Sequence, residues 1–111
     1  MSKQEIPIAC DLSALDDKAR HEAIGMDLMA QVQSVTPLDM GYQLELPISA
    51  LHQTVEFIDG ERRCCPFFHF GLQVEPAATR LQLQLTGGDG VKTMLEREIL
   101  PLLPTLPESN G

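Results

Sequence analysis

The stretch Phe68-His69-Phe70-Gly71-Leu72-Gln73-Val74-Glu75 decides the fold, because a large apolar residue alternates with a polar residue or glycine along it. This alternation places one apolar and one polar row on opposite faces and is typical of a half-buried strand. The segment Leu81–Thr86 alternates in the same way after a turn at 76–79. The two segments therefore predict a β-hairpin.

Two further segments show the same period of two. In Ile6–Leu12 the apolar row includes Cys10, and in Tyr42–Ile48 it includes Leu44 and Leu46. Each segment predicts one more strand with one face in the core. Cys10 would then point inward.

Helical spacing of apolar residues fills the gaps between these strands. We predict helices over 17–34 with Asp16 as N-cap, over 50–65 with Ser49 as N-cap, and over 91–102 with Asp89 as N-cap. Pro66 would end the second helix. Its expected buried stripe consists of Leu51, Val55, Ile58, Arg62 and Cys65.

These elements predict an α+β fold in the order β-α-β-α-β-β-α. We expect a two-layer sandwich in which a mainly antiparallel four-stranded sheet carries three helices on one face. Residues 1–103 would form a single domain, and residues 104–111 a flexible tail that contains proline. The open face of the sheet would be polar, and it would be either solvated or paired with another copy in a homo-oligomer.

Composition narrows the classes of partner. Eight basic and sixteen acidic residues give a net charge of -8, which disfavours binding to nucleic acid or to anionic lipid. No apolar run is long enough to span a membrane, so we expect a cytoplasmic protein. The three cysteines suggest no disulfide framework, and we expect reduced thiols. His21 and His52 are expected to be solvated on helix surfaces.

The chemically distinctive segment is Glu61–Phe70, which holds a carboxylate, two adjacent thiols and the imidazole of His69. These groups are ligands for zinc, and adjacent thiols also suit softer ions. The candidate metal ligands are Cys64, Cys65, Glu61, Cys10 and His69, with zinc or a soft metal ion as the possible cofactor. Strand alternation turns His69 away from the helix layer unless a bulge re-aims it.

The same residues allow a second interpretation. Buried cysteine is common, so Cys65 and Cys10 could be core residues of a structural or protein-interaction module that forms a homodimer. Cys64 would be the more accessible thiol. An enzyme is less favoured, because a thiol at a helix C-terminus faces a partial negative charge that opposes thiolate formation.

The segment Glu61-Arg62-Arg63-Cys64-Cys65-Pro66-Phe67-Phe68-x-Phe70 resembles a family of small uncharacterised bacterial proteins with an E-R-x-C-C-P-F-F-x-F signature. The resemblance extends to Cys10-x-Leu12 and to Gly90-Val91-Lys92. It implies a family site at Glu61, Cys64 and Cys65, with Cys10, and an association with bacterial heavy-metal resistance genes. It assigns no role to His69.

Overall fold

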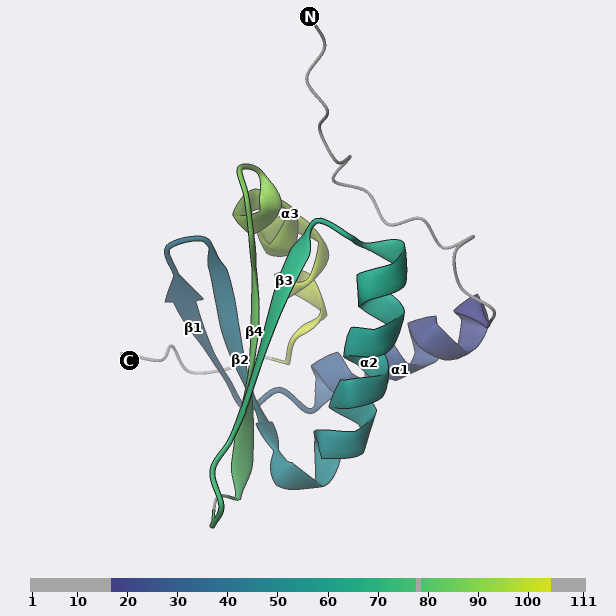
Figure 1. The fold of residues 1–111 in the computed structure, drawn as a ribbon, viewed down its shortest axis with the longest axis vertical. Helices are drawn as coiled ribbons and strands as arrows, with labels where there is room; N and C mark the ends of the chain where they lie inside the picture. Colours follow the sequence, from purple (N-terminus) through teal and green to yellow (C-terminus); the bar gives the residue numbers. More distant parts are fainter. Residues whose placement is uncertain (1–16, 78, 105–111) are drawn as a thin grey trace, which may run out of the picture.

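The computed structural model describes residues 17–77 and 79–104. Figure 1 shows a sheet with helices against it. In chain order the elements are α1 (Lys18–Ala30), β1 (Ser34–Leu38), β2 (Gly41–Pro47), the 3-10 turn η2 (Ile48–Ala50), α2 (Leu51–Cys64), β3 (Phe68–Val74), β4 (Arg80–Gly87), α3 (Val91–Glu98) and the 3-10 turn η3 (Leu100–Leu102).

The sheet is antiparallel throughout, with the strand order β1-β2-β4-β3. Its centre is the pair β2 and β4, in which Leu44 lies opposite Leu83 and Leu46 opposite Leu81. All four leucines are fully buried. Because successive side chains of a strand alternate between faces, this register gives the sheet one continuous apolar face.

The helices cover that apolar face. Leu28 of α1, Phe57 of α2 and Leu95 of α3 belong to one core cluster with the inner leucines of the sheet. The predicted fold class, an α+β sandwich with a four-stranded antiparallel sheet and three helices, is therefore confirmed. No helix in the described part of the chain is long and apolar enough to cross a membrane.

One of the four strands differs from the prediction. The first helix was predicted to reach residue 34, but α1 ends at Ala30 and Ser34–Leu38 forms β1, which pairs with β2. Thr36 and Pro37 favour extended backbone, and pairing with β2 holds them in it. The predicted strand at Ile6–Leu12 and, apart from residue 104, the predicted tail at 104–111 lie outside the described residues, so the predicted domain limits stay a prediction.

The three predicted helix caps were wrong in detail. Asp17, one residue after the predicted Asp16, accepts a hydrogen bond from the Arg20 N–H and caps α1. The turn η2 occupies the place where Ser49 was expected to cap α2. Gly90, in a left-handed conformation, precedes α3 in place of an Asp89 cap.

The outer face of the sheet is polar, as predicted. Glu45 on this face accepts hydrogen bonds from Ser34, Arg80 and Gln82. Partial burial acts to raise the pKa of the Glu45 carboxyl, but the hydrogen bonds from Gln82, Arg80 and Ser34 outweigh it, so the pKa lies below its ordinary value. Gln84 donates to Gln43 at 2.8 Å on the same face.

Tyr42 ties the sheet to α3. Its hydroxyl donates a hydrogen bond of 2.6 Å to Glu96, and its ring is buried. Burial, and then the hydrogen bond and charge of Glu96, raise the pKa of Tyr42 to about 12. Because the folded chain keeps this proton while the unfolded chain loses it near pH 10, stability is full below pH 10 and falls as the pH rises through about 12.

We predict that Tyr42→Phe lowers the free energy of unfolding at pH 8 by about 1 to 2 kcal/mol, through loss of the bond to Glu96. The difference between the two proteins should shrink between pH 10 and pH 12, because only the native protein carries the tyrosine proton. Urea unfolding at several pH values measures both quantities. A difference that stays constant with pH would contradict the assignment.

Candidate metal centre

The site is built on the last turns of α2. Residues three apart share a helix face, so Glu61 and Cys64 point to the same side as Phe57. That side faces the core, and Thr54 on it donates its hydroxyl to the Ala50 carbonyl at 2.8 Å. Pro66 cannot continue the helix, and the chain turns into β3.

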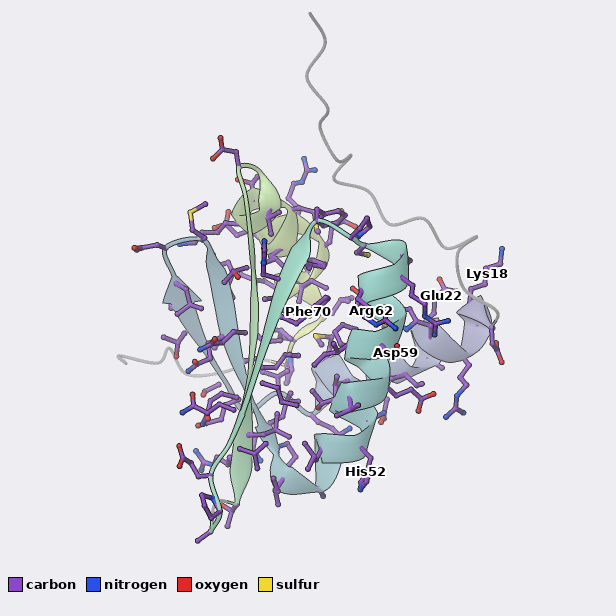
Figure 2. All side chains as sticks on the ribbon, viewed as in Figure 1. Lys18, Glu22, His52, Asp59, Arg62 and Phe70 are labelled. Carbon is purple, nitrogen blue, oxygen red and sulfur yellow. The ribbon has the colours of Figure 1, made fainter. Side chains whose placement is uncertain are left out.

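The predicted buried stripe of α2 was therefore wrong in part. Val55 and Arg62 on it are exposed, but Cys65 is fully buried, and Leu51 and Ile58 pack against the core as partly buried residues. The buried residues are Thr54, Phe57, Gly60, Glu61 and Cys64, whereas Val55 is 50% exposed. Charged side chains on α2, among them Asp59 and Arg62 (labelled in Figure 2), are exposed. Cys64 consequently lies in the core and is not the accessible thiol that the sequence suggested.

His21 is the residue that the sequence analysis missed. It comes from the first turns of α1, and its Nε2 lies 2.6 Å from Oε2 of Glu61. His21 is 8% exposed and Glu61 9%, so the prediction of a solvated His21 was wrong. The imidazole also stacks on Phe57, with ring centroids 5.8 Å apart. His52, by contrast, is exposed on α2 (Figure 2).

Gly60 makes the approach of α1 possible. A Cβ atom at position 60 would lie 2.5 Å from Cε1 of His21 and closer still to Nδ1. Polar contacts flank this close approach of α1 to α2: Arg20 pairs with Glu56 at 2.7 Å, and Gln31 donates to Gln53 at 2.7 Å. The imidazole therefore occupies the space that a side chain at 60 would fill.

Two sulfur atoms lie beside the His21–Glu61 pair. The Cys64 thiol donates to Oε2 of Glu61 at 3.7 Å, and its Sγ lies 3.5 Å from Sγ of Cys65. Both cysteines are fully buried. Cys64 is not in a disulfide, whereas Cys65 is disulfide-bonded. For Cys65, the expectation of a reduced thiol was wrong.

His21, Glu61 and Cys64 together offer one nitrogen, one oxygen and one sulfur donor atom, all within 4.8 Å of one another. A tetrahedral zinc ion at about 2.0–2.3 Å from its ligands would hold them roughly 3.3–3.8 Å apart. Small side-chain shifts reach that spacing. The structure thus brings together Glu61, Cys64 and Cys65 of the predicted ligands. His69 is exposed on the opposite face of β3, outside this group, and Cys10 lies outside the described residues.

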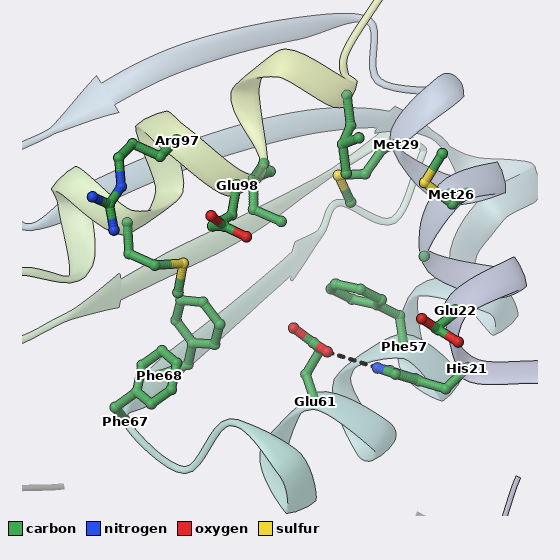
Figure 3. A pocket seen from close by; sticks show the side chains of 14 residues that line it. His21, Glu22, Met26, Met29, Phe57, Glu61, Phe67, Phe68, Arg97 and Glu98 are labelled. Atoms are coloured by element: carbon green, nitrogen blue, oxygen red, sulfur yellow. Dashed lines mark hydrogen bonds and ion pairs between the residues drawn. The ribbon is translucent and has the colours of Figure 1, made fainter. Parts of the chain in front are cut away.

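A pocket of about 540 Å³ opens on one side of this group. Figure 3 shows His21 and Glu61 on its wall, across from Phe67 and Phe68. Met29, Met94 and Phe57 add apolar surface, and Glu22, Arg97 and Glu98 also line it. Cys64 does not line the pocket, so its sulfur lies behind the two pocket-facing donors.

Comparison with protein-family models, curated proteins and solved structures finds no match. The resemblance to the bacterial E-R-x-C-C-P-F-F-x-F family stays a prediction. The geometry of the site is therefore the basis on which function is inferred.

We predict opposite effects for two glycine-to-alanine changes within helices. Gly60→Ala should lower the free energy of unfolding by roughly 1–2 kcal/mol, because its methyl group displaces the His21 ring from Glu61. Gly25→Ala is the matched control: its Cβ meets Phe57 at an ordinary 3.5 Å, so helix propensity should raise stability by about 0.5–1 kcal/mol. Urea unfolding measures the free energy of unfolding of both variants. Equal effects of the two substitutions would contradict the close approach of α1 to α2 at Gly60.

Proposed function

We propose that the protein binds a borderline or soft metal ion, with zinc as the first candidate, through His21, Glu61 and Cys64. The observation that carries the proposal is the convergence of imidazole, carboxylate and thiol in a buried cluster within 4.8 Å. Zinc accepts all three donor types in one site. The binding reaction releases the thiol proton, because the metal ligand is the thiolate.

Burial supports this proposal. A histidine and a glutamate with less than a tenth of their surface exposed have given up most of their contact with water. Such groups are costly unless each has a partner, and here the partners are one another and the Cys64 thiol. A cation would replace that hydrogen-bonded arrangement with three metal bonds, and the net charge of -8 favours its approach.

The remaining coordination of such an ion would face the pocket, because His21 and Glu61 line it and Cys64 lies behind them. A structural zinc site is closed by four protein ligands, whereas an open position admits water or a small ligand. In the cytoplasm, the compartment that we propose, thiols are kept reduced. There a dithiol reductant, itself oxidised to a disulfide, would return Cys65 to its thiol, 3.5 Å from Cys64, and Cys65 could add a second sulfur.

A structural and protein-interaction module, as a homodimer, is the second candidate. It is favoured by the complete burial of Cys64 and Cys65, which is the behaviour of small apolar core residues. In that case the His21–Glu61 contact would serve only to hold α1 against α2.

Metal titration of the reduced protein separates the two candidates. We expect the purified protein to bind zinc with one-to-one stoichiometry against a chromophoric chelator. Cys64→Ser and His21→Gln should each weaken binding by about tenfold or more, because each removes one ligand. Elemental analysis of protein purified without a metal-binding tag gives the native occupancy.

The matched controls are His52→Gln and His69→Gln, which remove exposed histidines outside the cluster and should leave the affinity unchanged. An unfolding curve for each variant shows whether it still folds. A native protein that binds no zinc, copper(I) or cadmium under reducing conditions would overturn the metal proposal. If Cys64→Ser then lowers only stability, the structural module is the better description.

A further inference from the structure

The two edges of the sheet differ in how well they are protected against further strand pairing. The edge strand β1 has five residues and contains Pro37, and both features disfavour the addition of a strand. The other edge strand, β3, pairs with β4 alone within the described ranges 17–77 and 79–104. Its seven residues include no proline, lysine, arginine or acidic residue. The outer backbone groups of β3 are therefore suited to accept another strand.

The inner face of β3 is unevenly covered. Phe68 at its start is 9% exposed and belongs to the core cluster, whereas Leu72 and Val74 towards its end are 39% and 42% exposed. Leu72 and Val74 lie opposite the fully buried Leu83 and Leu81 of β4, so these residues share the apolar face of the sheet. The second half of β3 thus leaves its inward side chains in contact with water.

The sequence of β3 is symmetric in character about Gly71. Reading outward from this glycine in either direction gives an apolar residue, a polar residue and a second apolar residue, and a proline stands five positions away on each side. The residues are Phe70, His69, Phe68 and Pro66 on one side, and Leu72, Gln73, Val74 and Pro76 on the other. An antiparallel contact between two copies of one strand requires such symmetry, because each half of the strand meets the other half of the partner's strand.

We propose that two copies of the protein pair through β3, antiparallel and in register about Gly71, so that their two four-stranded sheets join into one. In this register Phe70 lies opposite the partner's Leu72, and Phe68 lies opposite the partner's Val74. The exposed half of each strand is thereby covered by the aromatic half of the other. On the outer face, His69 meets the partner's Gln73, and both of these side chains are exposed in the single copy.

Charge favours the β3 edge as the place where two copies meet. Each copy carries a net charge of -8, so most contacts between copies bring like charges together. Because β3 holds no acidic side chain, pairing there keeps this repulsion small. A partner of another kind would need an open edge in β3 but no symmetry about Gly71. The symmetry is therefore the feature that favours a second copy as the occupant.

The proposed dimer does not depend on the proposed metal site. His21, Glu61 and Cys64 belong to α1 and α2, whereas the contact between copies is made by β3. Phe68 is the one residue of β3 that lines the pocket beside the metal cluster. Loss of metal binding and loss of the dimer can therefore be measured separately.

Sedimentation equilibrium of the full-length protein tests the dimer. We expect the native protein to associate as a dimer, and Leu72→Lys to associate at least about tenfold more weakly, because the lysine puts a charge opposite the partner's Phe70. Met40→Lys is the matched control. Met40 is 47% exposed in the turn between β1 and β2, so the same change there should leave association unchanged. A native protein that stays monomeric at every concentration would overturn the dimer, as would unchanged association in Leu72→Lys.

Cross-linking tests the register, and it decides the question even if Leu72→Lys fails to fold. When His69→Cys and Gln73→Cys are mixed and exchange subunits, a short bis-maleimide should join them, because opposite residues have Cβ atoms about 5 Å apart. Each variant alone is the control, since position 69 lies four residues, roughly 13 Å, from the same position of the partner. The native protein gives the background from its own cysteines. A mixture without cross-links, or one no better linked than each variant alone, would overturn the pairing about Gly71.

Discussion

Leucine side chains that meet in register across β2 and β4 are the constraint on which the structure depends. Leu44 lies opposite Leu83 and Leu46 opposite Leu81, and the four side chains form one apolar surface. Exposure of this surface to water is unfavourable, because full burial of each leucine stabilises the folded protein by about 2 kcal/mol. The helices must lie on that surface. Their position in turn decides which face of α2 enters the core, and so carries Glu61 and Cys64 inward.

The second constraint is electrostatic. Once α2 has turned Glu61 inward, its carboxylate needs partners, because a buried charge without them is costly. His21 provides one from α1, and the Cys64 thiol provides another from the same helix. The helix packing and the polar cluster are therefore not independent: moving α1 away from α2 would expose the core and leave the carboxylate without its imidazole.

The sequence predicted the secondary-structure elements in which apolar residues recur with a clear period. β2, β3, β4 and the end of α2 at Pro66 follow from alternation and from the missing proline N–H. β1 was missed because five residues with a proline have no clear period, and only pairing with β2 defines them.

The sequence predicted only part of the candidate metal site. Glu61, Cys64 and Cys65 stand together in the sequence, whereas His21 joins them only through tertiary packing. One signal was present, since His21 precedes the buried Leu28 by seven residues and therefore shares its helix face. The face of α2 could not be decided from the sequence, because the helix carries two apolar rows and the choice depends on where α1 lies.

Gly60 has a consequence beyond this molecule. A helix interior disfavours glycine by about 1 kcal/mol, so a glycine retained there marks a place where a side chain would do more harm. Here a side chain at position 60 would displace the imidazole of His21, a residue that lies forty positions before Glu61 in the sequence. A glycine followed by glutamate and, three residues later, by cysteine, with a histidine about forty residues before the glutamate, is thus a search pattern for recognising distant relatives that have kept the site while the rest of the sequence has changed.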